Sequence, residues 1–282
     1  MNLNYLFYHK YFDFLADEKA PSPAEMNAAI TCATVKTKVQ ADSFGQTFYM
    51  KTTYPGLLIG IGNAHDAARN TQDRNEANLV KDAVKLGFTL DYVTGLPVIP
   101  GSTVKGVLRS AFSEHPEYVK EKLEEVTGDA RWAEMSNATL KKIENEMFGD
   151  KQNPNTAKQD VFFAAIPVKA GARSRLLGED FVTSHKGDTC ELDGLVEPNP
   201  VRMLKVLPGV VFAFRFQCLL NEIDGYCMTP ELKMNLFAGI LEDLGIGAKT
   251  NTGYGNMVTV CLSEEEQKYT LEIDKVEIGK QV

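Results

Sequence analysis

The stretch from residue 244 to residue 255, LGIGAKTNTGYG, is the one around which the rest of the chain is organised. It contains four glycines and a single cation, Lys249. Because glycine adopts positive φ angles and has no Cβ, such a run can turn tightly and aim backbone N–H groups at an anion such as a phosphate. The alternative is a helix C-cap followed by a β-bulge, and composition alone does not separate the two interpretations.

The composition is that of a globular protein. The chain has 282 residues, of which 44% are hydrophobic and 24% charged, enough for one large or two ordinary domains. It has no long apolar run, and its aromatic N-terminus lacks a cleavage site, so we expect no membrane span, no secretory signal and a cytoplasmic location. The five cysteines show no C-x-x-C spacing. This favours reduced, mostly buried thiols, and we expect neither a metal nor a cofactor.

The charge is negative overall but unevenly distributed. A formal net charge of −8 argues against a non-specific nucleic-acid binder. Three stretches nevertheless contain cations and no acid: residues 99–112 with Lys105 and Arg109, residues 164–178 with Lys169, Arg173 and Arg175, and residues 245–262 with Lys249. Acidity therefore coexists with three locally basic segments.

Hydrophobic periodicity predicts an α+β protein. We expect strands in 47–61, 88–99, 161–168, 200–220 and 254–262, and helices in 24–30, 76–86, 116–126, 133–148 and 229–244, with a further helix starting at Ser102 or Thr103. In that helix Lys105 and Arg109 lie opposite the apolar stripe, which for two cations is usually a solvated face. Residues 169–199 lose periodicity, and an excursion of this length tends to be functional. Strand–helix–strand units near both ends suggest two related, degenerate halves.

Common catalytic and nucleotide-binding motifs do not fit. The glycines at 245 and 247 are followed by Thr250 where a dinucleotide fingerprint needs glycine, and they follow a helix instead of a strand. Ala248-Lys249-Thr250 lacks the glycine that precedes the lysine of a P-loop. The chain has four histidines and no G-x-S-x-G elbow, so no hydrolase triad can be assembled.

Four stretches together resemble the RAMP superfamily of CRISPR RNA-guided effector subunits. They are GLLIGIG (56–62), LDYVTGLPVIPGSTVKGVLRSAF (90–112), FGDKQ followed by VFFAAIP (148–167), and LGIGAKTNTGYG. The N-terminal NLNYLFYHKYF and the segment PNPVRMLKVLPGVVFAFRF (198–216) are similar to the family of the sixth Cmr subunit of type III-B complexes. The resemblance covers most of the chain.

The resemblance implies an α+β fold with a ferredoxin-like, RRM-like RAMP core, either single or as two tandem halves, with an inserted arm and extra helices. We expect one RAMP domain over 1–282, with an N-terminal half at 1–168, an arm at 169–199, a C-terminal half at 200–262 and an acidic tail at 263–282. The implied function is a non-catalytic subunit that caps a filament and holds the 3′ part of guide RNA and its target duplex in antiviral defence. The implied partners are guide CRISPR RNA, target RNA, other Cmr RAMP subunits and small helical subunits, without a membrane.

The expected RNA contacts follow from the basic segments together with this resemblance, because single strands are gripped through phosphates and stacking. The residues are Lys105, Arg109, Lys249, Thr250, Asn251 and Tyr254 on the core, and Lys169, Arg173, Arg175, His185 and Lys186 on the arm. Relatives often carry Pro-His-Tyr in the arm, whereas this chain has Ser184-His185-Lys186, which weakens the case for His185.

Two alternatives remain open from the sequence. The first is a metal-dependent target-RNA endoribonuclease of the same superfamily, which would use Asp66 or Asp73 in the loop after the first strand. Against it, the segment LGFTLDYVTGLP differs from the D-x-P-I-x-R pattern of cutting subunits. The second is a protein–protein scaffold that acts through the aromatic N-terminus and the helices between residues 116 and 148. The sequence does not decide whether 169–199 forms a thumb hairpin.

Overall fold

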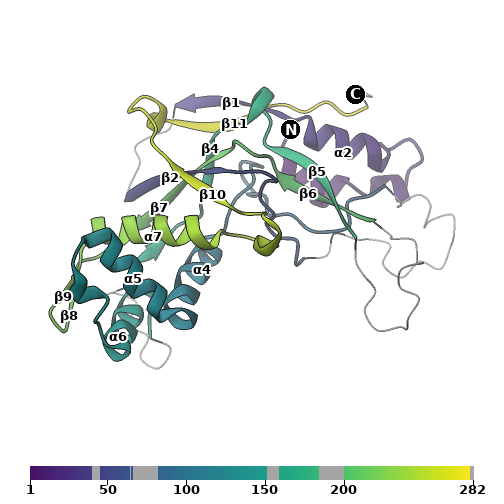
Figure 1. Cartoon of the computed structure of the whole chain (residues 1–282). Helices are drawn as coiled ribbons and strands as arrows, with labels where there is room; N and C mark the ends of the chain where they lie inside the picture. Colours follow the sequence, from purple (N-terminus) through teal and green to yellow (C-terminus); the bar gives the residue numbers. More distant parts are fainter. Residues whose placement is uncertain (40–44, 64, 66–81, 151–158, 184–199, 280–282) are drawn as a thin grey trace, which may run out of the picture.

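The computed structural model describes residues 1–39, 45–63, 65, 82–150, 159–183 and 200–279. The core is an antiparallel sheet. Its strand order is β10-β2-β7-β3, with β4 also paired to β7 (Figure 1). The strands are β2 (Gln46–Thr52), β3 (Val161–Phe162), β4 (Ile166–Lys169), β7 (Val211–Gln217) and β10 (Met257–Val260). Helix α4 (Gly101–Glu114) lies between β2 and β3 in the chain, and α7 (Pro230–Leu244) between β7 and β10.

This β-α-β-β-α-β order is the ferredoxin-like arrangement, so the predicted fold class is confirmed. The residues that the structure describes form one such unit. Residues before 170 supply β2, α4, β3 and β4, and residues after 210 supply β7, α7 and β10. The strand–helix–strand patterns near the two ends of the chain are therefore complementary parts of a single core.

Alternation along β7 shows why the sheet has a helical side. Phe212, Phe214 and Phe216 are buried in the main core, whereas Val211 and Ala213 belong to a small second cluster on the other face. Across the sheet, the Phe48 ring of β2 stacks on Phe214 with ring centroids 5.4 Å apart. Because side chains alternate between the two faces of a strand, these phenylalanines form a row on the face that the helices cover.

Helices α4 and α7 pack against this face of the sheet (Figure 1). Helix α5 (Pro116–Thr127) packs on both of them and α6 (Asn137–Phe148) packs on α4, and each contributes buried apolar side chains. The Thr229 hydroxyl accepts the Leu232 N–H at 3.1 Å and Pro230 follows, which confirms the predicted start of α7. Helix α4 instead begins at Gly101 after Pro100 without a side-chain cap, so the predicted cap at Ser102 or Thr103 was wrong.

The remaining elements lie around this core. They are α1 (Leu3–Tyr5), η1 (Leu6–Lys10), η2 (Asp13–Leu15), α2 (Pro23–Thr31), β1 (Thr34–Val39), η3 (Ala130–Trp132), η5 (Ala172–Ser174), β5 (Leu177–Thr183), β6 (Pro200–Val206), β8 (Asn221–Ile223), β9 (Tyr226–Met228), η7 (Thr250–Thr252), η8 (Glu266–Lys268) and β11 (Tyr269–Lys275). Strands β5 and β6 form an antiparallel ribbon, β1 pairs with β11, and β8 pairs with β9. Of the ribbon strands, only β5 belongs to the expected arm, and it pairs with β6 of the expected C-terminal half. Residues 184–199 of that arm lie outside the described residues.

Several predicted elements need correction. The expected acidic tail contains strand β11, and its partner β1 was not predicted. The strand expected over 161–168 is split into β3 and β4, and 88–99 forms single bridges, Leu90 to Pro97 and Ile99 to Ala165, in place of two strands. Residues 76–81 of one expected helix lie outside the described range, and 82–86 are not helical. Among the four described cysteines only Cys218 is buried, so the expectation of mostly buried thiols was wrong.

A buried ion pair ties the start of α7 to the sheet edge. Lys233 is fully buried, and its Nζ lies 2.9 and 2.7 Å from the two carboxylate oxygens of Asp160. The same ammonium donates to the Leu219 carbonyl at 2.7 Å and to the Asn221 side-chain oxygen at 2.5 Å. Because the Lys233 ammonium serves all these acceptors, its removal would leave the buried Asp160 carboxylate without a compensating charge.

We therefore expect Lys233→Met to lower the free energy of unfolding by about 3–5 kcal/mol. The double variant with Asp160→Asn should recover part of this loss, because the isolated charge is then also removed. Urea unfolding of the two variants and wild type measures the effect. If the free energy of unfolding of Lys233→Met lies within roughly 0.5 kcal/mol of the wild-type value, as for a neutral surface change, this interpretation is wrong.

Candidate nucleic-acid interface

The glycine-rich loop, residues 245–255, is bound to a short extended segment at 56–58. On one side of this segment, Leu57 and Val206 of β6 exchange N–H···O hydrogen bonds of 3.0 and 2.8 Å. On the other side, the Gly255 N–H donates to the Gly56 carbonyl at 2.8 Å and the Ala248 N–H to the Leu58 carbonyl at 3.0 Å. The segment therefore joins the glycine-rich loop to the base of the ribbon β5–β6.

The glycines of the loop are required by close backbone approach. A Cβ on Gly255, whose φ is 74°, would lie 1.9 Å from the Ile246 carbonyl oxygen, and one on Gly247 would lie 2.4 Å from that of Leu58. Six loop N–H groups, those of residues 245, 246, 248, 252, 253 and 255, already donate to backbone carbonyls. The expectation that such a run aims bare amides at an anion is thus wrong for these six groups, because they hold the loop in place.

The loop is a helix cap followed by an exposed turn. Gly245 ends α7 with a φ of 68°, and its N–H donates to the Leu241 carbonyl at 3.0 Å. Lys249 then adopts the left-handed conformation, φ 60°, at the start of the single turn η7, and its side chain is exposed. Asn251 is also exposed, whereas Thr250 and Tyr254 are half-buried. The part of the loop available to an anion is therefore the turn around Lys249.

Tyr254 connects the loop to the ribbon. Its hydroxyl donates to Oδ2 of Asp180 on β5 at 2.6 Å, and Nζ of Lys205 on β6 lies 2.6 Å from the same oxygen. Burial raises the pKa of Asp180, but hydrogen bonds from Lys205 and Tyr254 outweigh it and bring the pKa below its usual value. Burial, followed by the bond to Asp180, raises the pKa of Tyr254. Tyr254 is thus a structural contact as well as a predicted RNA contact.

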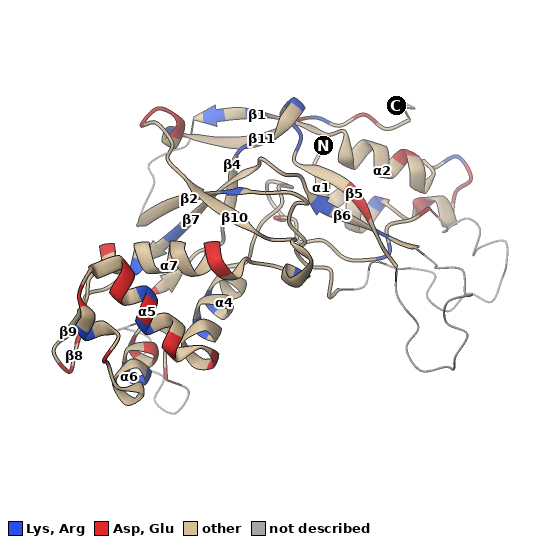
Figure 2. Cartoon of the chain, viewed as in Figure 1, with Lys and Arg blue, Asp and Glu red and all other residues tan. Residues whose placement is uncertain are grey.

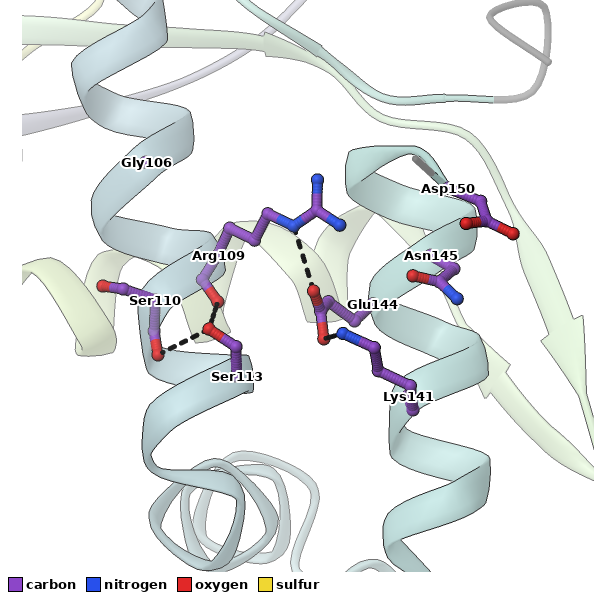
Figure 3. A pocket seen from close by; sticks show the side chains of 8 residues that line it. All are labelled: Gly106, Arg109, Ser110, Ser113, Lys141, Glu144, Asn145 and Asp150. Atoms are coloured by element: carbon purple, nitrogen blue, oxygen red, sulfur yellow. Dashed lines mark hydrogen bonds and ion pairs between the residues drawn. The ribbon is translucent and has the colours of Figure 1, made fainter. Parts of the chain in front are cut away.

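Arg109 lies in a hollow of about 540 Å³ between α4 and α6 (Figure 3). Its Nε donates to Oε1 of Glu144 at 3.0 Å, and Lys141 binds the other oxygen at 2.7 Å. The Glu144 side chain is only 2% exposed, so this carboxylate needs its cations. The face that carries Arg109 is therefore covered by α6 and is not simply solvated. Figure 3 shows the terminal guanidinium nitrogens turned away from Glu144.

Lys105, one turn earlier on α4, is half-buried as well. Its Nζ lies 5.8 Å from the centre of the Phe162 ring, close enough for a cation–π contact. Burial, with a smaller effect of Arg109, lowers the pKa of Lys105. Lys105 and Arg109 thus form one basic group on the helical side of the sheet.

The arm cations form a third group near β1 and β11. Lys169 is paired with Glu266 at 2.8 Å, Arg175 forms a backbone bridge to Thr34, and Arg173 is exposed. His185 and Lys186 lie outside the described residues, as do Asp66 and Asp73 of the nuclease alternative. The three basic stretches thus pack against different elements, and acidic side chains are frequent on α5 and α7 (Figure 2).

Sequence reasoning missed Glu144, Asp180 and Lys205. Each has the appearance of an ordinary solvated charge in its segment, and the partner is far away in sequence: 35 residues for Glu144 with Arg109 and 74 for Asp180 with Tyr254. Within the described ranges, no three His, Cys, Asp or Glu side chains are grouped to hold a metal ion. None of the helices in those ranges is both long and apolar enough to span a bilayer.

The residues that match a known protein family include the core sheet and the glycine-rich loop. The model of the RAMP superfamily matches residues 49–258, from β2 to β10. The chain belongs to the RAMP superfamily. The match includes the segment at 56–58, the ribbon and the whole glycine-rich loop, which are the parts joined in the described junction.

The chain is also similar to individual proteins and solved structures. The CRISPR system Cmr subunit Cmr6 of Pyrococcus furiosus is 26% identical over 268 residues, which cover 79% of this chain and 76% of that protein. A chain in the cryo-EM structure of the Type III-B Cmr-beta bound to cognate target RNA is 19% identical, with a TM-score of 0.49 over 85% of this chain and 61% of that one. The crystal structure of Cmr6 from Pyrococcus furiosus gives 20% identity and a TM-score of 0.41, covering 80% and 98%.

Two glycine substitutions separate backbone strain from steric exclusion. Gly128, with φ 69°, has open space where a Cβ would lie, so Gly128→Ala should cost only the left-handed penalty of about 1–2 kcal/mol. Gly255→Ala should cost clearly more, because the methyl group would overlap the Ile246 carbonyl. Denaturant unfolding of both variants measures the difference. Equal losses would show that the loop tolerates a side chain at position 255.

The contact between loop and ribbon should depend on pH. Because the pKa of Asp180 is lower in the folded protein, its stabilisation is present above the ordinary value of about 3.9 and is lost as the pH falls through the folded value. Asp180→Asn should therefore lower the free energy of unfolding by about 1–2 kcal/mol at neutral pH. The difference from wild type should shrink near pH 3. Urea titrations at both pH values test this, and a difference independent of pH would contradict it.

Proposed function

We propose that this chain is a non-catalytic RNA-binding subunit of a type III-B CRISPR effector complex. In this proposal it caps the filament and holds the 3′ part of the guide RNA and its target duplex in antiviral defence. Membership of the RAMP superfamily and the similarity to Cmr6 of Pyrococcus furiosus support the complex. The observation that carries RNA contact is the exposed, left-handed Lys249 at the tip of a loop that is fixed on both sides to the core.

Backbone contact is the mode that this geometry favours. Lys249 offers a compact cation, and Thr250 and Asn251 next to it offer short polar side chains that suit a phosphate. Lys105 and Arg109 form a second contact group, and Lys169, Arg173 and Arg175 a third on the arm, with His185 and Lys186 beyond the described residues. Each neutralised phosphate adds about −0.7 to the log–log salt slope of single-strand binding. A few such contacts fit an acidic subunit that acts within an assembly.

The proposed protein partners are other Cmr RAMP subunits and small helical subunits. The aromatic N-terminus is divided between core and surface, since Leu3 and Phe7 are buried while Tyr5 is 51% and Tyr8 39% exposed. Such exposed aromatic side chains are enriched at protein interfaces. The nuclease alternative would need Asp66 or Asp73, which lie outside the described residues, and no described observation favours it.

Lys249→Ala should weaken retention of guide RNA in the assembled complex and make the salt slope shallower by about 0.7, because one phosphate contact is lost. The matched control is Lys268→Ala, which removes another exposed lysine, on η8 in the segment between β10 and β11. Arg109→Ala is a poorer probe, because it also removes a cation from the buried Glu144. Filter binding of labelled guide RNA across a salt titration is the measurement.

Thermal unfolding of each variant provides the fold control. Equal retention and equal slopes for wild type, Lys249→Ala and Lys268→Ala would argue against RNA contact through the loop. With normal co-purification of partner subunits, that result would favour the scaffold interpretation.

A further inference from the structure

Tyr54 is the most exposed large apolar or aromatic side chain among the described residues, at 84%. It lies between the end of β2 and the segment at 56–58, directly beside the glycine-rich loop. Tyrosine combines an apolar ring with a polar hydroxyl and is enriched at binding interfaces, so this ring is a candidate contact. Neither the basic segments nor the family motifs draw attention to this residue.

The backbone on both sides of Tyr54 is fixed to the loop. The N–H and hydroxyl of Thr53 both donate to the Asn256 carbonyl, at 3.1 and 2.9 Å. On the other side, the Gly56 carbonyl accepts the N–H of Gly255 in the loop at 2.8 Å. The ring is therefore presented from a rigid support, which limits the conformational entropy lost when a ligand binds.

The surroundings of Tyr54 combine aromatic and cationic groups. Burial and then Asp180 are the main causes that raise the pKa of Tyr254, and Tyr54 is close enough to raise it further. From Gly253, which faces Pro55, the turn η7 leads back to Lys249 over four residues. At a rise of about 2 Å per residue, this turn places the Lys249 backbone within about 8 Å of the Gly253 backbone. An exposed ring and an exposed cation thus lie next to the same turn of the loop.

We infer that Tyr54 stacks on a base of the single-stranded RNA whose phosphate backbone contacts Lys249. The inference rests on the proposed function and adds the element that holds a base to the elements that hold phosphates. Every base has a π face, so the contact tolerates any guide sequence, as a subunit that holds variable guides requires. The ring is attached to a fixed backbone and is open to solvent. A base can therefore stack on it without displacing another side chain of the protein.

The test uses the assembled complex with guide RNA that carries one 5-iodouridine, placed in turn at each position of the 3′ half. Ultraviolet light crosslinks such a base to an aromatic ring stacked on it. We expect a crosslink from one position that maps to Tyr54, and loss of it in Tyr54→Ala with about 5- to 100-fold weaker RNA retention. Tyr54→Phe and Tyr54→Trp should keep retention, because stacking needs the ring and not the hydroxyl.

The matched control is Tyr92→Ala, which removes a tyrosine that is 78% exposed on the turn at 91–94, and it should behave as wild type. If Tyr54→Ala retains RNA and crosslinks like Tyr92→Ala, the inference is wrong while the proposed function stands. If wild type forms no crosslink and retains no RNA, both are wrong. Loss of a partner subunit with unchanged RNA retention would assign Tyr54 to a protein interface and overturn the inference.

Discussion

Hydrogen bonding of residues 56–58 on both sides is the constraint on which the rest of the candidate interface depends. The segment pairs with Val206 on one side and with Ala248 and Gly255 on the other. Through it, the first core strand, the ribbon β5–β6 and the glycine-rich loop share one backbone network. The contact of Tyr254 and Lys205 with Asp180 connects the same elements through side chains. The position of Lys249 is therefore determined by the core and not by the loop alone.

The elements that were predicted correctly carry strong local signals. The alternating phenylalanines of β7 indicate a half-buried strand, and Thr229-Pro230 indicates the start of α7. The ribbon of β1 and β11 was missed because its outward side chains, such as Lys36 and Glu272, are charged and paired with each other across the strands. A charged strand at the surface has no apolar period that distinguishes it from a solvated tail.

The site was less predictable, for two physical reasons. A glycine needed for close backbone packing and a glycine needed for an anion have the same sequence signature, and here Gly247 and Gly255 serve packing. Similarly, a cation on a helix has the same appearance in the sequence whether it faces water or a buried carboxylate, and Glu144 decides this for Arg109. The turn around Lys249 is exposed, and its contact with RNA stays a prediction. Cations such as Lys169 and Arg202 are already paired with acids, which makes them less available to an anionic partner than the sequence indicates.

The pairing of β1 with β11 has a consequence for biosynthesis. Thr34 is opposite Lys275, so β1 must wait on the ribosome for a partner strand made more than 200 residues later. The central sheet has the same property, because β2 is bordered by β7 and β10, both from the second half of the chain. Contacts so distant in sequence make folding slow and largely post-translational. During synthesis, the core-facing side chains of β2, Phe48 and Met50, stay uncovered until β7 and β10 have been made.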